Sequence, residues 1–215
     1  MNKLNIFISG SKYFGQEVLR LCLQNGHNVV GVCCSFEDKY IGRLANTFGI
    51  PIIQGGTLCY DNMPDNVDLG ITAHSFDYIG KKTRYKPKYG WIGYHPSLLP
   101  RHRGRSSIEW ALRMNDPITG GSVFWLNSGI DRGDIERQDW IWLDRTKKAS
   151  EIWRADLMPL GIKLLGEAIS DISNGKINKT PQDSRFSTFE PSLDVKDVFK
   201  PDLLMLGPAQ CHAGH

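Results

Sequence analysis

The sequence predicts an α/β fold: a doubly wound, mainly parallel sheet that carries an antiparallel extension and a C-terminal arm. Short apolar runs alternate with helical patterns through residues 4–94, which is typical of parallel strands joined by helices. Two strand-like runs then follow one another between residues 121 and 143, separated by a Gly-rich turn, which favours antiparallel pairing. After residue 180, prolines interrupt the chain too often for a long element, which indicates an extended arm.

The first half of the chain supplies most of the predicted parallel strands. Residues 4–9 form an apolar run that predicts a buried strand, ending at Gly10. Residues 13–24 carry apolar side chains at helical spacing and are closed by Gly26, which predicts a helix packed on the sheet. The same alternation predicts the following elements: strands at 28–34, 50–53, 68–73 and 90–94, and a short helix at 40–48.

The second half predicts helices on either side of the antiparallel extension. A helix is expected at 106–114, and strands at 121–126 and 134–143 are expected to pair around the turn that holds Asp131. Residues 148–173 have a helical pattern. Pro159 interrupts it, and because proline has no backbone N–H, it should start a new segment or kink the helix. We therefore expect a domain at 1–180 and an arm at 181–215.

Composition limits the class of protein. The chain has 215 residues, 40% of them hydrophobic and 23% charged, with a net charge of +3, which is ordinary for a soluble globular domain. No apolar run reaches membrane-spanning length, and the first residues enter a strand rather than a signal peptide. The five cysteines have no disulfide or metal-site spacing, so we expect reduced thiols, no metal and a cytoplasmic location.

The apolar residues of the arm can cover the domain or a second subunit, so a homodimer is one expected assembly.

The first turn of the chain resembles a dinucleotide fingerprint only in part. Gly10 and Gly15 occupy the outer glycine positions, but Lys12 stands where the middle glycine lets backbone approach a pyrophosphate. We therefore discount NAD and FAD. Two interpretations stay open: a plain strand-to-helix turn, or a site for a single phosphate at the helix N-terminus.

Residues 78–108 contain no acidic side chain. Their basic residues are Lys81, Lys82, Arg84, Lys86, Lys88, Arg101, Arg103 and Arg105. Such a stretch predicts a local field that attracts anions, for example a folate glutamate tail, a phosphorylated substrate or RNA, unless it is simply a solvated rim.

His95 and Asp131 are the candidate catalytic residues. His95 lies between the apolar run 91–94 and a Pro-bounded turn, so it should close a strand. Asp131 lies in the Gly-rich turn between the two antiparallel strands. Alone, each is explained by ordinary hydrogen bonding or turn chemistry. Together, an imidazole and a carboxylate at strand ends suit proton transfer at a carbonyl centre.

These residues lie in motifs that resemble the enzymes that use 10-formyltetrahydrofolate as a formyl donor. The motifs are His-Pro-Ser-Leu-Leu-Pro at 95–100, Arg-His-Arg-Gly at 101–104, Ser-Ile-Glu-Trp-Ala-Leu at 107–112, Gly-Gly-Ser-Val at 120–123 and Gly-Ile-Asp at 129–131. Their order and spacing are similar to those of glycinamide ribonucleotide, methionyl-tRNA and sugar-amine formyltransferases, and locally most similar to the hydrolase domain of formyltetrahydrofolate dehydrogenase. The resemblance covers roughly residues 1–180 and implies the Rossmann-like formyltransferase fold.

The resemblance also implies roles for particular residues. His95 would hydrogen-bond the formyl oxygen or protonate the leaving folate nitrogen, and Asp131 would orient the imidazole and accept a proton. The pterin of 10-formyltetrahydrofolate, the implied co-substrate, would lie in a slot between two loops. The residues implied for this slot are Phe76, Asp77, Tyr78 and Ile79 from one loop, and Asn127, Ser128, Gly129 and Ile130 from the other. Core packing would equally explain Phe76 and Ile79.

One residue of the family pattern is missing. Most transferases of this family have an Asn two residues before the His, where its amide helps to hold the oxyanion, and here that position is Gly93. The hydrolase domain of formyltetrahydrofolate dehydrogenase also lacks this Asn and passes the formyl group to water. Ser11, Ser97 or His102 are candidates for the missing donor, although His102 is expected at the surface of a turn.

Three functions are consistent with these observations. The first is formyl transfer from 10-formyltetrahydrofolate to a primary amine of a small, anionic molecule. The second is hydrolysis of the same donor, and the third is a non-catalytic folate-binding protein. The glycinamide ribonucleotide enzymes carry a Gly-Ser-Asn phosphate loop that this chain lacks, and the basic loop and RNA-binding domain of the tRNA enzymes are also missing, so a nucleic-acid acceptor is not expected.

Overall fold

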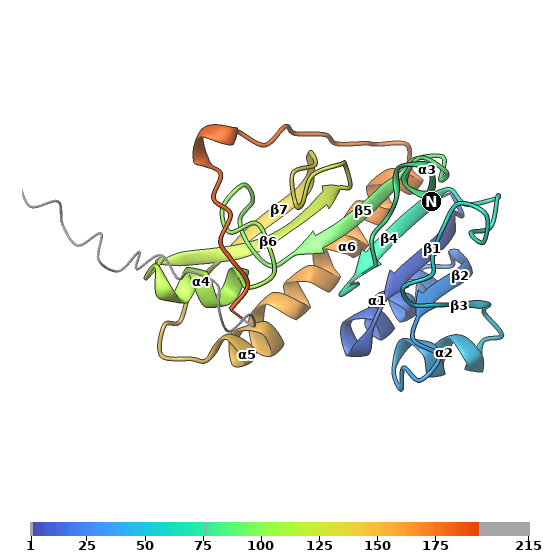
Figure 1. The fold of residues 1–215 in the computed structure, drawn as a ribbon, viewed down its shortest axis with the longest axis horizontal. Helices are drawn as coiled ribbons and strands as arrows, with labels where there is room; N and C mark the ends of the chain where they lie inside the picture. The colour runs from blue at the N-terminus through green and yellow to red at the C-terminus, as the bar shows by residue number, and fades with distance from the viewer. Residues whose placement is uncertain (1, 76, 194–215) are drawn as a thin grey trace, which may run out of the picture.

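The computed structural model describes residues 2–75 and 77–193 and confirms the α/β class. Its seven strands form one sheet in the order β3-β2-β1-β4-β5-β6-β7, in which neighbouring strands from β3 to β5 are parallel and β6 is antiparallel to both β5 and β7 (Figure 1). The strands are β1 Asn5–Gly10, β2 Asn28–Cys34, β3 Ile52–Gln54, β4 Leu69–Ala73, β5 Trp91–His95, β6 Ile118–Trp125 and β7 Ile135–Trp142.

The helices lie between and after the strands as the alternation predicts. They are α1 Lys12–Gln24, α2 Ile41–Thr47, α3 Lys81–Arg84, α4 Ser107–Arg113, α5 Ala149–Ile152, a π-helical stretch Trp153–Leu157, α6 Met158–Ser173 and a 3-10 turn Ser184–Phe186. The short helix α3 was not expected from the sequence. No helix among the described residues combines the length and apolar character needed to cross a membrane.

Most elements end within one or two residues of their predicted bounds, and two differ by more. Strand β6 begins three residues earlier than expected, because Ile118 and Thr119 pair with Trp142 and Ile141 of β7. The helical stretch 148–173 is divided by its π-helical segment, directly before α6. Pro159 lies in the first turn of α6, where its missing N–H leaves no hydrogen bond unmade, so the predicted new segment is confirmed.

Both faces of the sheet are covered, so its central strands are apolar on both sides. In β1, Ile6 and Ile8 pack into the larger core, which α1 and α6 share, whereas Phe7 belongs to a second core on the opposite face. The rings of Phe7 and Trp91 meet edge to face with 6.0 Å between their centroids. Gly70 makes this packing possible, because a Cβ there would overlap the Trp91 ring.

Residues 181–193 cross the molecule from the start of β7 to α4 (Figure 1). Thr180 pairs with Ile135 of β7, and the Trp110 indole of α4 donates to the Pro191 carbonyl at 2.9 Å. The rest of the expected arm, residues 194–215, lies outside the described residues. The division into a domain and an arm stays a prediction.

Candidate active site

Strand β5 delivers His95 to the carboxyl end of the parallel strands. Alternate residues of a strand face the same side of the sheet, so Gly93 and His95 share one face while Tyr94 points to the other. The Tyr94 ring packs against Gly121 of β6, where any Cβ atom would overlap the ring. This contact holds the Tyr94 side chain on its own face of the sheet. Its hydroxyl donates to the Leu157 carbonyl at 2.6 Å, which ties β5 to the helical layer.

A cavity of about 710 Å³ opens beside His95. This volume lies within the usual range of small-molecule sites, and the carboxyl end of parallel strands is where such sites form in α/β sheets. The cavity is lined from α1 by Lys12 and Phe14, from β4 and its loop by Thr72, His74 and Ser75, and from later segments by Arg105, Ile130, Asp131 and Trp153.

The structure brings the two predicted catalytic residues together at the wall of this cavity. Nδ1 of His95 lies 3.7 Å from Oδ2 of Asp131. Nε2 of His95 lies 2.7 Å from the His102 carbonyl oxygen, which can only accept, so the Nε2 atom carries the proton in the neutral imidazole. Nδ1, on the side of Asp131, is then free to take up a proton. The pair is therefore arranged for proton transfer.

Asp131 is held by the backbone around it. Its carboxylate accepts a hydrogen bond from the Gly104 amide at 2.8 Å. Its φ of 51° lies in the left-handed region, which Asp tolerates better than most residues. The arm contributes as well: the Gln182 amide donates to the Asp131 carbonyl at 2.9 Å and to the Gly133 carbonyl at 2.7 Å. The turn is thus fixed from two sides.

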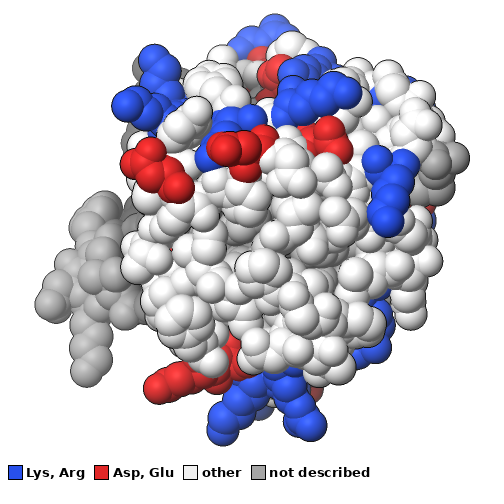
Figure 2. Space-filling view, turned by 90° about the vertical axis from the view of Figure 1, so that its right-hand side faces the viewer, with Lys and Arg blue, Asp and Glu red and all other residues white. Residues whose placement is uncertain are grey.

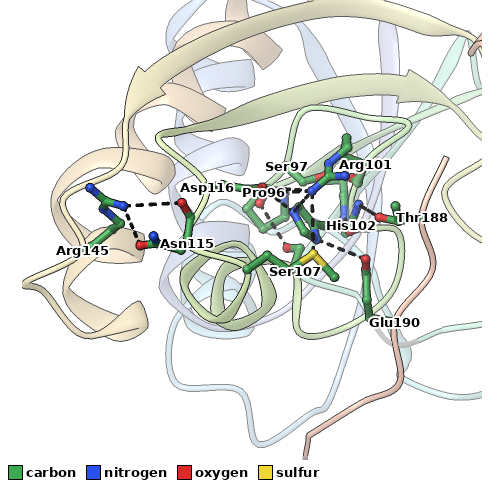
Figure 3. A network of polar contacts seen from close by, with 12 residues as sticks. Pro96, Ser97, Arg101, His102, Ser107, Asn115, Asp116, Arg145, Thr188 and Glu190 are labelled. Atoms are coloured by element: carbon green, nitrogen blue, oxygen red, sulfur yellow. Dashed lines mark hydrogen bonds and ion pairs between the residues drawn. The ribbon is translucent and has the colours of Figure 1, made fainter. Parts of the chain in front are cut away.

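His102 is buried, with 2% of its surface exposed, so the expectation of a surface position was wrong. Its Nε2 lies 2.8 Å from Asp116, and its Nδ1 lies 3.3 Å from Glu190 of the arm (Figure 3). Burial by itself would lower the pKa of His102, but the two carboxylates outweigh it and raise the pKa. Because the His102 carbonyl accepts from His95, this network also holds the imidazole of the candidate catalytic residue His95.

The first loop of the predicted folate slot follows β4. Phe76 lies outside the described residues. The Asp77 carboxylate accepts from the Ser9 hydroxyl at 2.8 Å, Tyr78 is 83% exposed, and Ile79 is buried in the second core. From this loop, His74 and Ser75 line the cavity.

The second loop follows β6. Ile130 lines the cavity, and the Asn127 side chain accepts from the Gly129 amide at 2.8 Å, while Ser128 is exposed. The structure therefore places Ile130 beside His95 and Asp131. Pterin binding by the two loops stays a prediction.

The structure describes ion pairs for two cations of the basic stretch at 78–108. Lys86 forms an ion pair with Asp65 at 2.7 Å, and Arg101 pairs with Asp116 at 3.3 Å. Arg105 lines the cavity. Figure 2 shows the face beside β3 and α2, where side chains of both charges lie along the upper and lower borders with an uncharged area between them. The carboxylates of Asp65 and Asp116 thus offset part of the positive charge that the sequence predicts for this stretch.

Sequence reasoning missed two residues at or behind this site, Gln182 and Thr72. For Lys12 it left two interpretations open, and the structure places this residue, with a φ of 57°, in the lining of the cavity. Gln182 gave no signal because it belongs to an irregular arm. Thr72 lies in the strand 68–73 that the sequence did predict, but its position beside Gly93 depends on the register between two strands.

Comparison with known proteins shows similarity to formyltransferases and to 10-formyltetrahydrofolate dehydrogenases. The formyl transferase family model matches residues 61–157. Mouse mitochondrial 10-formyltetrahydrofolate dehydrogenase is 35% identical over 206 residues, which cover 88% of this chain but 22% of that protein. Methionyl-tRNA formyltransferase of Alkaliphilus oremlandii is 29% identical over 215 residues, covering 93% of this chain and 68% of that protein.

Solved structures give the same result for the fold. The crystal structure of an N-formyltransferase from Helicobacter canadensis in complex with folinic acid and dTDP-3-aminofucose has a TM-score of 0.76 at 18% identity, covering 89% of this chain and 72% of that chain. The sheet order and the antiparallel extension are thus those of a formyltransferase fold. Residues 61–157 of this chain thus match the formyl transferase family, and the chain has the fold of these solved formyltransferases.

Proposed function

We propose that this chain transfers a formyl group from 10-formyltetrahydrofolate to a primary amine of a small, anionic acceptor. The observation that carries the proposal is the 3.7 Å approach of His95 and Asp131 at the wall of a cavity of about 710 Å³. The match of residues 61–157 to the formyl transferase family supports the reaction class. The cations Lys12 and Arg105, which line the same cavity, support an anionic acceptor or the negative charge of the folate.

The proposed mechanism follows from the positions of the two side chains. The acceptor nitrogen attacks the formyl carbon, and the formyl oxygen becomes an oxyanion as the new C–N bond forms. Protonated His95 donates from Nδ1 to this oxygen or to the leaving folate nitrogen, whose bond to the carbon then breaks. Asp131 stabilises the charged imidazole and takes up the proton that the acceptor amine releases.

Hydrolysis of the same donor is the second candidate. Two observations favour it: Gly93 stands where most transferases of the family have an Asn, and the 10-formyltetrahydrofolate dehydrogenase of mouse is 35% identical. In this reaction water would take the place of the amine, with the same roles for His95 and Asp131. A non-catalytic folate-binding protein is the third.

One assay separates these candidates. Release of tetrahydrofolate from 10-formyltetrahydrofolate is followed with the purified chain, with and without a pool of primary amines that includes nucleotide-linked amino sugars. Release that requires an amine supports the transferase. Equal release without amine supports the hydrolase, and no release under either condition contradicts both and leaves the binding protein.

We further propose small molecules, rather than nucleic acid, as partners, because the candidate site is a cavity of small-molecule size and two cations of the basic stretch, Lys86 and Arg101, are paired within the chain. A cytoplasmic location belongs to the same proposal and is supported by the free thiols of Cys22, Cys33 and Cys34. The homodimer stays a prediction, which sedimentation velocity of the full chain tests.

A further inference from the structure

Position 93 carries no side chain, and the hydroxyl group of Thr72 occupies the space beside it. Thr72 of β4 is the register partner of Gly93 in β5, and the two strands run in parallel (Figure 1). A Cβ atom built on Gly93 would overlap Oγ1 of Thr72, closer than non-bonded heavy atoms approach. The threonine hydroxyl thus lies where an Asn side chain at position 93 would begin.

The Thr72 hydroxyl lies on the same side of the sheet as the catalytic imidazole. Gly93 and His95 are two residues apart on β5 and therefore share one face. The hydroxyl, which fills the space in front of Gly93, lies on that face as well. Thr72 and His95 both line the cavity. A hydroxyl donor beside His95 in a partly closed cavity is the arrangement that stabilises an oxyanion.

The three other candidates for the missing donor are engaged elsewhere. The Ser11 hydroxyl donates to the His74 carbonyl at 2.6 Å, and the Ser97 hydroxyl donates to the Arg101 carbonyl at 2.6 Å. The ring of His102 faces the carboxylates behind the site. By contrast, the Thr72 side chain makes no hydrogen bond to any residue that the structure describes. Its proton is free for a ligand in the cavity.

We propose that Thr72 is a catalytic residue, whose hydroxyl donates a hydrogen bond to the formyl oxygen as it becomes an oxyanion and so replaces the missing Asn amide. The proposal rests on the proposed function, because the oxyanion belongs to formyl transfer or hydrolysis. Thr72 forms no covalent bond in this role, and its proton stays on the hydroxyl. The proposed hydrogen-bond donor thus belongs to β4, whereas the Asn of most transferases of the family would lie at position 93 in β5.

If the Thr72 hydroxyl replaces the Asn amide, the effect of a substitution at position 93 should depend on the residue at position 72. Gly93→Asn alone places its Cβ against the Thr72 hydroxyl and should disturb both strands. When Thr72 is also replaced by Ala, the nearest remaining atom is Cδ1 of Leu126 at 3.2 Å, the end of a flexible side chain. In the double variant Thr72→Ala/Gly93→Asn, the Cβ that carries the family's amide therefore no longer meets the Thr72 hydroxyl.

The test measures tetrahydrofolate release from 10-formyltetrahydrofolate by the full chain and its variants. Thr72→Val keeps the shape of the side chain without its hydroxyl, and we expect kcat to fall about 100-fold while KM for the donor changes by less than about threefold. Thr72→Ser keeps a donor and should recover most of this loss. The double variant should turn over at least about tenfold faster than Thr72→Ala, because an amide donor is restored.

Thr119→Val is the matched control, since Thr119 is a buried strand threonine of β6 outside the cavity lining, and its kcat should equal that of the unaltered chain. Thermal unfolding of each variant shows that it is folded. Near-normal kcat in folded Thr72→Val would overturn the proposal for Thr72 and leave the proposed function intact. Absence of turnover in the unaltered chain would overturn the proposed function and this inference with it.

Discussion

At the scale of single residues, the site depends on which nitrogen of His95 carries a proton. The carbonyl of His102 holds the proton on Nε2, and this leaves Nδ1 to exchange a proton near Asp131. His74, a second imidazole in the cavity wall, has a pKa lowered by burial and by the nearby Lys12 ammonium, so it is neutral near pH 7. The two histidines therefore differ in surroundings: one faces a carboxylate and the other a cation.

Removing either member of the catalytic pair should abolish most of the turnover. We expect His95→Ala and Asp131→Asn to lower kcat at least about 100-fold, because each removes a proton-transfer partner. The Asn oxygen can still accept from Gly104, so the turn should persist. Asp134→Asn, a nearby carboxylate outside the cavity lining, serves as the matched control. Near-normal kcat in either site variant, on a substrate that the unaltered chain uses, would show that the assigned roles are wrong.

Residue types and spacing were enough to predict that His95 and Asp131 lie together, because His95 ends β5 and Asp131 lies in the turn between β6 and β7. The same pattern failed for His102. Its burial depends on Glu190, which is distant in the sequence and belongs to a segment without periodicity. Thr72 was missed for a related reason: a strand pattern shows which residues alternate, but not which residue of the next strand lies opposite.

At the scale of elements, the described part of the arm acts as a brace for both catalytic loops. Gln182 donates to the turn that holds Asp131 and accepts from Arg103 at 2.7 Å, and the Thr188 hydroxyl accepts from the His102 amide at 2.8 Å. The prediction that the arm packs on the domain is consistent with these contacts. Its composition indicated an apolar contact, whereas the contacts that position the site are polar.

Loss of this brace should slow catalysis without unfolding the domain. Gln182→Ala leaves the Asp131 and Gly133 carbonyls and the Arg103 guanidinium without this partner, so the turn gains freedom. We expect kcat to fall about tenfold, with faster amide hydrogen exchange in residues 103–104 and 131–133. Asp183→Ala removes a neighbouring side chain that binds Arg185 at the surface and should change neither quantity. Unchanged exchange in Gln182→Ala would contradict the bracing role.

The packing of the central strands requires a glycine at position 70, beside the buried Trp91 ring. Gly70→Ala should lower the free energy of unfolding by about 1–3 kcal/mol, because its Cβ would overlap the buried Trp91 ring. In α6, Gly166→Ala places its Cβ in ordinary contact with Leu21 at 3.4 Å, and there better helix propensity should leave stability equal or higher. Urea unfolding of both variants checks this contrast. Equal effects would mean that the strand register near Trp91 is not as described.

At the scale of the whole molecule, the cavity lies where the sheet changes from parallel to antiparallel strands. β5 ends there in His95, and the turn between β6 and β7 returns Asp131 to the same place. This convergence could be predicted from the order of the elements, since strand direction follows from the length of the connections. The depth of the cavity could not, because it depends on side chains from α1, β4 and the π-helical stretch together.

Stability of the whole chain should depend on pH through His102 and Glu190. The pKa of His102 is raised in the folded state, so its contribution is present below its ordinary pKa of about 6.5 and lost as pH rises through the folded pKa. Burial opposes ionisation of Glu190, but His102 outweighs it and lowers the carboxyl pKa, so this contribution is lost as pH falls. Stability from the pair should therefore be greatest between about pH 4.3 and 6.5.

Urea unfolding across pH checks this dependence. Glu190→Gln should flatten the loss of stability above neutral pH, because His102 then keeps only Asp116. Glu17→Gln, which breaks a surface pair with Arg20, should leave the profile unchanged. Identical profiles for Glu190→Gln and the unaltered chain would show that the network does not set the pH dependence.

The most direct test of the central claim is a crystal structure of this chain with folinic acid, which carries a formyl group on a folate. We expect the ligand to fill the cavity beside β5. Its formyl group should face Nδ1 of His95 and the carboxylate of Asp131, at about 3.2 Å or less or through one water. A folate bound elsewhere, or a bound folate with the His95 and Asp131 side chains turned apart, would contradict it.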